Sequence, residues 1–167
     1  MSIAERRIAY LALGGNMGDR SAVLNAALLH INAIEETRVL RCSSLYDTEP
    51  WGVSEQADFL NTVAEVETAL DALQLFRAIK SIESVMGRLE TRRYGPRLID
   101  IDLLLLDQTI VDDPVLTVPH PGIPTRRFVL VPLCELAPEL VHPLLGKTMR
   151  ELLAACEDTG QVRTCIE

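Results

Sequence analysis

Two carboxylates and two arginines fall within the ten residues from Arg93 to Asp102 (RYGPRLIDID). Asp100 and Asp102 are two residues apart in a segment that reads as a strand, so their side chains point to the same face. Adjacent carboxylates repel, and an apolar neighbourhood raises their pKa values unless a cation lies between them. Carboxylates together with substrate phosphates suit Mg²⁺, and arginines suit phosphate oxygens. The stretch is therefore typical of a site for a metal-bound nucleotide.

An Asp-x-Asp pair at the start of a strand is also common on the solvated face of an edge strand. Here the leucines at 103–106 follow the pair, which favours a central strand covered on both faces, where uncompensated charges are costly. Between Arg88 and Arg97 the chain carries four arginines and one glutamate. In an acidic protein, this local positive charge favours a small polyanion as the ligand.

The composition limits the class of protein. With 167 residues, 48% of them hydrophobic, residues 1–167 are expected to form a single domain. The net charge of −8 and a pI near 4.9 argue against partners such as nucleic acid or an anionic membrane. The sequence shows no signal peptide and no apolar run that could span a bilayer. The four cysteines form no zinc pattern, and Cys42 and Cys134 stand among apolar residues, so we expect core thiols in a reduced, cytoplasmic protein.

The elements that must position the site are predicted from apolar periodicity and turn residues. Strands are expected over 7–14, 39–46 and 59–66 and at Asp100–Asp102, and helices over 22–34, 71–86, 129–136 and 148–155. Asp19 is placed to cap the first helix. The segments 47–56 and 115–128 are expected to be a loop and an irregular stretch. The order β-α-β-β-α-β, with two helices on one side of an antiparallel sheet, predicts an α+β, ferredoxin-like fold built from two βαβ units.

The turn Gly14-Gly15-Asn16 lacks the spacing of a Walker A loop and of a dinucleotide fingerprint. On its own it is explained as a strand-to-helix turn that needs positive φ. A nucleotide must therefore be held by other groups, which directs attention to the arginines, the carboxylates and the segment around His120.

Two further groups of residues have both a functional and a structural explanation. An aromatic loop around Trp51, followed by Phe59 and Asn61, would form a flat slot with hydrogen-bond donors at one edge, which suits a planar heterocycle. Alternatively, Phe59 is a core residue and Asn61 satisfies a main-chain group. His120 lies between two prolines and close to Arg126, where it would contact a phosphate, although a lone loop histidine is more often structural or solvated.

The chain resembles the 6-hydroxymethyl-7,8-dihydropterin pyrophosphokinase family in six segments: LALGGNMGDR, YDTEPWG, DFLNTV, IESVMGR, RRYGPRLIDIDLLL and LTVPHPGIPTRRFVLVPL. The resemblance runs from about residue 8 to residue 153. It implies transfer of pyrophosphate from ATP to the hydroxymethyl group of 6-hydroxymethyl-7,8-dihydropterin in folate biosynthesis, with release of AMP. It further implies two Mg²⁺ ions held at Asp100 and Asp102. We expect a monomer.

The resemblance also implies roles for individual residues. Arg88 and Arg97 would act in catalysis beside the two aspartates. Residues expected to contact the nucleotide are Lys80, Glu83, Arg93, Leu103, His120 and Arg126. Residues expected to bind the pterin are Gly14, Thr48, Glu49, Trp51, Phe59, Asn61, Tyr94 and Phe128, with the ring between Phe128 and Tyr94. Tyr94 and Phe59 stand where the family often has a different aromatic residue, and Pro121 replaces an aromatic residue seen in other members. The choice between Arg92 and Arg93 as the phosphate contact stays open.

Two other functions would fit parts of this sequence. One is a ferredoxin-like binding domain that has kept the fold and lost the chemistry. The other is a second pterin-pathway activity such as an aldolase, which needs acid–base groups and no nucleotide, and which leaves the paired aspartates and the arginines unexplained. Release of AMP would separate both from a pyrophosphokinase.

Overall fold

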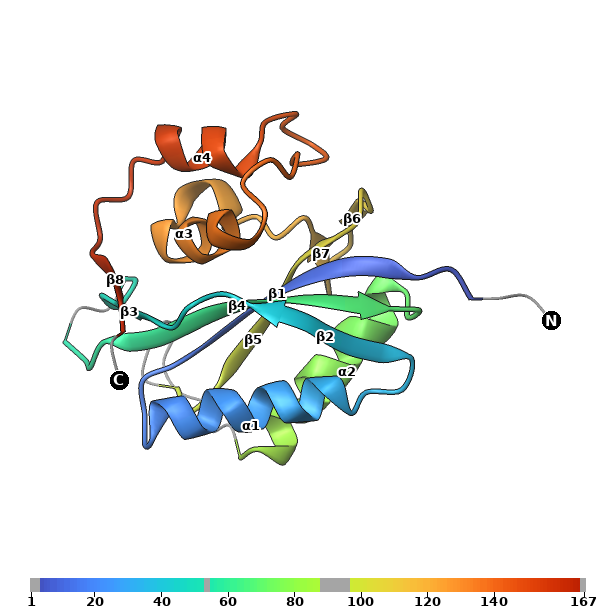
Figure 1. The fold of residues 1–167 in the computed structure, drawn as a ribbon, viewed down its shortest axis with the longest axis horizontal. Helices are drawn as coiled ribbons and strands as arrows, with labels where there is room; N and C mark the ends of the chain where they lie inside the picture. Colours follow the sequence, from blue (N-terminus) through green and yellow to red (C-terminus); the bar gives the residue numbers. More distant parts are fainter. Residues whose placement is uncertain (1–3, 53–54, 88–96, 166–167) are drawn as a thin grey trace.

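The computed structural model describes residues 4–52, 55–87 and 97–165 (Figure 1). The main strands are β1 (Arg7–Gly15), β2 (Thr37–Cys42), β3 (Tyr46–Thr48), β4 (Phe59–Thr68), β5 (Asp100–Leu106) and β8 (Val162–Thr164). A separate short hairpin consists of β6 (Val111–Asp112) and β7 (Thr117–Val118). The helices are α1 (Arg20–Asn32), α2 (Ala72–Val85), α3 (Arg127–Leu136) and α4 (Met149–Ala155), with a 3-10 turn at Ile123–Thr125.

The main sheet has the strand order β5-β1-β4-β3-β8, and β2 pairs with the other half of β4. All of these pairings are antiparallel. Asp19 caps α1 and Asp71 caps α2, each by accepting a main-chain hydrogen bond in the first turn. The expected α+β, ferredoxin-like arrangement is confirmed.

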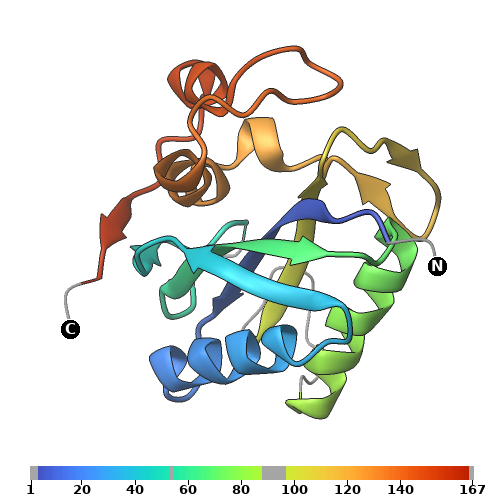
Figure 2. The same cartoon turned by 45° about the vertical axis from the view of Figure 1, so that its right-hand side comes forward.

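Helices cover both faces of the sheet, as Figures 1 and 2 show. On one face, α1 and α2 pack against a core that includes Leu24, Ile79 and Ile101. On the other face, α3 and α4 enclose a second core that includes Leu130 and Leu104. The expected pair of helices on one side is therefore present, and the C-terminal pair adds a third layer that the βαβ pattern did not predict.

The strand expected over 39–46 is two strands in the structure. The break falls at Ser43, whose main-chain nitrogen donates to the Val63 carbonyl oxygen at 2.8 Å, while its hydroxyl accepts from the Val63 nitrogen at 2.9 Å. Because a side-chain oxygen replaces the main-chain acceptor, the regular ladder stops there. The expected loop over 47–56 was also wrong at its start, since Asp47 and Thr48 belong to β3.

Strand β5 lies at the edge of the sheet, and the expectation of a central strand was wrong. It reads as a central strand because Ile101 to Leu106 are mostly buried between the two helical layers. Its outer main-chain edge is satisfied by other means. The nitrogen and carbonyl oxygen of Ile101 bond the side chains of Glu83 and Lys80, and the Leu104 carbonyl oxygen accepts from the His120 nitrogen at 2.9 Å.

Two further expectations need correction. Cys42 is exposed and not a core thiol, because β2 forms the outer edge of its half of the sheet and only Thr37 is buried in it. Cys134 is half-buried and packs against the second core. Strand β8, which lies beside β3, was not predicted, because its three residues are too few to show an apolar pattern. None of the helices in the described ranges is long and apolar enough to cross a membrane.

Candidate active site

A cavity of about 310 Å³ opens between β1, β4 and β5 on one side and the first turn of α3 on the other. It collects residues from six separate parts of the sequence, around positions 12–14, 48–51, 59–62, 80, 97–102 and 120–129. Those among the sequence-predicted site residues are Gly14, Thr48, Glu49, Trp51, Phe59, Asn61, Lys80, Arg97, Asp100, Asp102, His120, Arg126 and Phe128. The structure therefore brings together most of the residues that the resemblance singled out.

Asp100 and Asp102 both line this cavity from the start of β5. They lie opposite Gly14 and Ala12 of β1 and are half-buried, while Ile101 between them is fully buried. The prediction that the two carboxylates share a face is confirmed. Burial, followed by the neighbouring Asp100 carboxylate, raises the pKa of Asp102 to about 6. The pair is therefore a site of excess negative charge that favours a cation.

Basic side chains already approach both carboxylates. The Lys80 Nζ lies 3.8 Å from Asp102 Oδ1, and an Arg97 guanidinium nitrogen lies 3.3 Å from Asp100 Oδ2. Arg126 lines the same cavity and lowers the pKa of Asp102. Cationic groups thus stand beside the carboxylates on more than one side, an arrangement that can hold an anion and a metal ion next to each other.

Glu83 and Leu103 do not line the cavity. The Glu83 side chain is 2% exposed, accepts a 2.7 Å hydrogen bond from Lys80 Nζ, and accepts another at 3.2 Å from the Ile101 nitrogen. Leu103 is buried in the core against α1 and α2. Lys80 also donates to the Ile101 carbonyl oxygen at 2.8 Å. Glu83 therefore orients Lys80 and braces β5 from behind the cavity.

Gly14 and Gly15 are required because other residues approach their Cα atoms closely. The expectation that this Gly14-Gly15-Asn16 turn needs positive φ was wrong. Gly14 and Gly15 end strand β1, and the residue with positive φ is Gly18 at 66°. A Cβ on Gly14 would lie 2.2 Å from Asn61 Oδ1, and one on Gly15 would lie 2.2 Å from the Leu98 carbonyl oxygen. Both positions are thus packed against other walls of the site.

Asn16 does not line the cavity, but it supports a residue that does, Arg97, and this role was not predicted from the sequence. Asn16 is 8% exposed, and its side-chain nitrogen donates to Gln56 Oε1 at 2.9 Å and to the Ala57 carbonyl oxygen at 2.8 Å. Its side-chain oxygen accepts from the Arg97 nitrogen at 2.8 Å. Asn16 therefore joins the segment before β4 to the segment before β5. The sequence shows that Asn16 belongs to the GGN turn, but it does not show that Asn16 bonds residues near positions 56 and 97.

The residues of the expected flat slot, Trp51, Phe59 and Asn61, all line the cavity, and the ring that packs against Trp51 is Phe128. The Trp51 and Phe128 rings lie with centroids 6.0 Å apart at 58°, and the Arg126 guanidinium carbon lies 5.7 Å from the Trp51 ring centroid. The Asn61 amide nitrogen donates to Thr48 Oγ1 at 2.5 Å. The slot thus offers an apolar face and a polar edge, as a planar heterocycle requires.

His120 is held in one tautomer. Its Nδ1 accepts a hydrogen bond from the Gly122 nitrogen at 2.9 Å, which leaves the proton on Nε2 of this cavity-lining residue. Burial, followed by the Arg126 charge, lowers the pKa of His120 to about 4. His120 is therefore a neutral hydrogen-bond donor at pH 7. The expected roles of Arg88, Arg93 and Tyr94 fall on residues outside the described ranges.

The structure thus defines a class of protein with a ferredoxin-like sheet whose edge strand presents two carboxylates beside basic groups and an aromatic surface, an arrangement suited to an anion and a flat ring. The chain belongs to the 7,8-dihydro-6-hydroxymethylpterin-pyrophosphokinase (HPPK) family, whose family model matches residues 10–138. The resemblance found in the six sequence segments is thereby confirmed.

Curated relatives agree with this assignment. The chain is 44% identical over 152 residues to the 2-amino-4-hydroxy-6-hydroxymethyldihydropteridine pyrophosphokinase of Methylorubrum extorquens, covering 91% of this chain and 95% of the relative. The protein of the same name from Pseudomonas aeruginosa is 42% identical, with coverages of 90% and 93%. The folic acid synthesis protein fol1 of Schizosaccharomyces pombe is 44% identical over 93% of this chain, which spans only 21% of that protein.

Solved structures support the fold. The HPPK-DHPS of Plasmodium falciparum with pteroate superposes with a TM-score of 0.72 at 19% identity, covering 93% of this chain and 43% of that one. Another structure of the same protein, with STZ-DHP, gives a TM-score of 0.73 at 18% identity, covering 90% and 43%. The chain thus spans less than half of these neighbours, and at this identity the likeness concerns the fold.

Proposed function

We propose that this chain is a Mg²⁺-dependent pyrophosphokinase in which Asp100 and Asp102 hold the metal and the cavity holds both substrates. The family transfers the pyrophosphoryl group of ATP to the hydroxymethyl group of dihydropterin in folate synthesis, and the chain shares this activity. The observation that carries the proposal is the pair of carboxylates on one face of β5, opening into the cavity that also contains the aromatic slot.

The reaction depends on how the two substrates are positioned and does not require a covalent bond to the enzyme. The pterin hydroxyl oxygen attacks the β-phosphorus of ATP in line, a new O–P bond forms, and the bond from that phosphorus to the α-phosphate bridging oxygen breaks. AMP leaves with that oxygen, and the hydroxyl proton passes to solvent. Placement of the two substrates and neutralisation of the phosphate charge therefore supply most of the rate.

The donor set fits Mg²⁺. Two carboxylates with room for phosphate oxygens and water match the preference of this ion for a few protein ligands and a shell completed by substrate. Burial, followed by the Asp100 carboxylate, raises the pKa of Asp102, and a bound cation would favour its ionised form. Within the described residues, no cluster of three or more His, Cys, Asp or Glu side chains could hold a metal alone, which fits a shell shared with ATP. Bound Mg²⁺ would neutralise charge shared across the triphosphate.

Each side of the cavity suits one substrate. Arg97, Arg126 and the His120 Nε2–H would bind phosphate oxygens, and Lys80, oriented by Glu83, would complete the positive field around the triphosphate. Phe128 and Trp51 would contact the pterin ring, with Asn61 and Thr48 at its polar edge. From the family resemblance, we also assign Arg88 and Arg93 to phosphate contacts and Tyr94 to the pterin. A cytoplasmic location and a monomeric chain are part of the proposal.

The test is AMP formation from ATP and Mg²⁺, measured by chromatography with and without 6-hydroxymethyl-7,8-dihydropterin. We expect AMP only when the pterin is present, and none after Mg²⁺ is removed with a chelator. A simple kinase or ATPase would give ADP. Failure of the folded chain to form AMP would overturn the proposal in favour of a binding domain. Light scattering on the same sample tests the monomer.

A further inference from the structure

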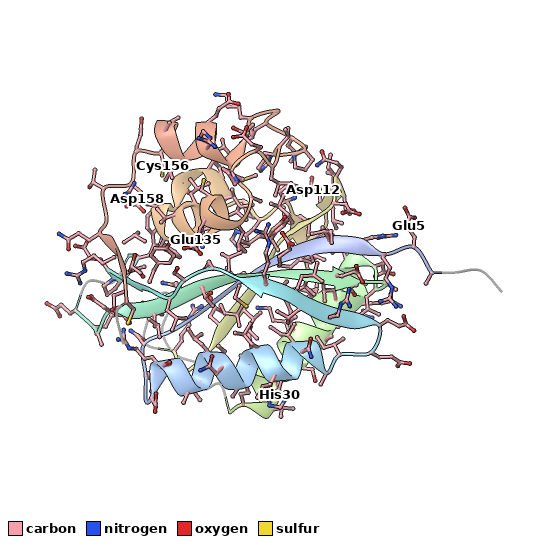
Figure 3. The ribbon with its side chains drawn as sticks, viewed as in Figure 1. Glu5, His30, Asp112, Glu135, Cys156 and Asp158 are labelled. Atoms are coloured by element: carbon pink, nitrogen blue, oxygen red, sulfur yellow. The ribbon has the colours of Figure 1, made fainter. Side chains whose placement is uncertain are left out.

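The C-terminal segment 156–165 crosses from one wall of the aromatic slot to the other. Strand β8 pairs with β3, so that Val162 lies opposite Thr48, and the Glu49 nitrogen donates to the Gln161 carbonyl oxygen at 3.3 Å. Figure 3 labels Asp158 in the stretch of chain that runs from α4 down to β8. This segment therefore lies against the wall that carries Thr48, Glu49 and Trp51.

The Asp158 carboxylate connects this segment to the opposite wall. One oxygen accepts from the main-chain nitrogen of Arg127 at 2.9 Å, and the other accepts from the Gly160 nitrogen at 2.9 Å. Arg127 is the first residue of α3, and the helix receives no capping hydrogen bond from the side chain at its own N-cap position, Arg126. Asp158 thus caps α3 from a position 31 residues further along the chain.

The first turn of α3 carries two residues that line the cavity, Arg126 and Phe128. Phe128 faces Trp51 at 6.0 Å between ring centroids, and Arg126 lies over the same Trp51 ring. Trp51, Phe128 and Asp158 also line a common hollow next to the cavity. At this distance and tilt the two rings are in contact with each other, so any shift of this helix turn relative to β3 would alter that contact and move the aromatic surface that lines the cavity.

We propose that Asp158 is a positioning residue that holds the contacting Trp51 and Phe128 rings in place as the aromatic surface of the slot. It ties the start of α3 to β8, and β8 is paired with β3, so the segments that carry both rings are fixed to one short segment. A planar ligand depends on the placement of the aromatic surface on which it packs, whereas a flexible arginine can follow a phosphate, so the effect falls on the pterin and not on ATP. The choice of pterin as the ring rests on the proposed function.

The chain offers a direct probe of the slot, because Trp51 is its only tryptophan. We would compare the parent chain with Asp158→Ala, which loses both hydrogen bonds, and with Asp158→Asn, which keeps one acceptor oxygen. Asp113→Ala is the matched control, since Asp113 accepts a similar main-chain hydrogen bond, from Val115 at 2.9 Å, in the β6–β7 turn. Acrylamide quenching of Trp51 and the KM values for both substrates would be measured.

For Asp158→Ala we expect stronger quenching of Trp51 and a KM for the pterin raised about ten-fold, with the KM for ATP changed less than about two-fold. Asp158→Asn should lie between this variant and the parent, and Asp113→Ala should match the parent. Unchanged quenching and pterin KM in both Asp158 variants, with only a lower melting temperature, would overturn the proposal. If the parent makes no AMP, the proposed function fails, and the quenching comparison still decides whether Asp158 holds the two rings in place.

Discussion

The side-chain oxygen of Asn16 accepts a hydrogen bond from the main-chain nitrogen of Arg97 at 2.8 Å, and the Arg97 carbonyl oxygen accepts from the Asn16 nitrogen at 2.9 Å. This two-way bond fixes the main chain of Arg97 just before β5 begins. The Arg97 side chain is thereby directed to Asp100, 3.3 Å away. The end of β1 thus controls the position of an arginine that approaches the carboxylate pair.

Asn16→Ala should lower kcat by about ten-fold or more, because Arg97 loses its support at the site. It should also lower the free energy of unfolding by roughly 2 kcal/mol, since a buried amide and its partners lose their hydrogen bonds. Asn16→Asp keeps the acceptor for the Arg97 nitrogen but loses the two hydrogen bonds that the amide donates. Its kcat should therefore stay close to that of the parent, while its free energy of unfolding should fall. Denaturant unfolding and AMP release measure the two effects. Asn25→Ala, on the exposed face of α1, is the control: kcat should not change, and the better helix propensity of alanine should raise the free energy of unfolding by no more than about 0.7 kcal/mol.

Asp102→Asn should reduce turnover by at least about 100-fold and weaken Mg²⁺ binding in the presence of a non-hydrolysable ATP analogue, measured by calorimetry. The fold should survive. Because the raised pKa shows that folding disfavours the ionised carboxyl, the variant should gain on the order of 1 kcal/mol of stability at pH 7. Asp112→Asn, an exposed residue of β6, is the charge-matched control. Substantial turnover and unchanged Mg²⁺ affinity in Asp102→Asn would contradict the metal assignment.

Gly14→Ala should raise the KM for the pterin by about ten-fold, because its Cβ would lie 2.2 Å from Asn61 Oδ1 and must displace that amide. In an Asn61→Ala background the clash disappears, so the same change should add little. The measurement is a double-mutant cycle in kcat/KM for the pterin, with a coupling energy of about 1 kcal/mol or more. Additive losses in the double mutant would show that Gly14 is not required for the placement of Asn61.

His142 should make the stability depend on pH. It is 4% exposed, and its Nδ1 accepts from the nitrogens of Leu144 and Leu145 at 3.2 and 3.1 Å. Burial lowers the pKa of His142 below its ordinary value of 6.5. The unfolded chain therefore binds a proton that the folded chain does not, and stability should fall as the pH drops below about 6.5, by up to about 1.4 kcal/mol per pH unit.

His142→Asn keeps an acceptor oxygen in place of Nδ1 and cannot titrate. Urea unfolding between pH 5 and pH 8 should therefore give a smaller loss of stability at low pH for this variant than for the parent. The pKa of His120 is also lowered, but His120 is present in both chains, so its contribution cancels when the pH dependence of the variant is subtracted from that of the parent. Equal pH slopes for the two chains would show that His142 does not titrate differently on folding.

The sequence allowed the chemistry-bearing residues to be predicted where local rules apply. The two-residue spacing of Asp100 and Asp102 fixes their common face in any strand, and Asp19 and Asp71 mark helix starts by their caps. The family resemblance added residues from distant segments, such as Asn61 and His120, which the structure brings to one cavity. Their roles in binding remain predictions.

The features that were missed depend on long-range contacts. The break at Ser43 arises from a hydrogen bond to Val63, and the importance of Asn16 arises from partners 40 and 81 residues away. The apolar pattern of β5 predicts a central strand, but the strand lies at the sheet edge, because an apolar pattern indicates burial of the two faces and not pairing of the main-chain edges. Strand β8 has too few residues for a pattern and exists because β3 offers an unpaired edge.

The side-chain hydrogen bonds at the outer edge of β5 affect the solubility of the whole molecule. A free strand edge is a template on which another chain can add a strand, and it is a common starting point for aggregation. Here Lys80 and Glu83 occupy the main-chain acceptor and donor of Ile101. Lys80, which approaches the Asp102 carboxylate, and its ion-pair partner Glu83 thus also protect the strand from self-association. Neutral substitutions at these positions, chosen to alter catalysis, should therefore also lower the solubility of the folded protein.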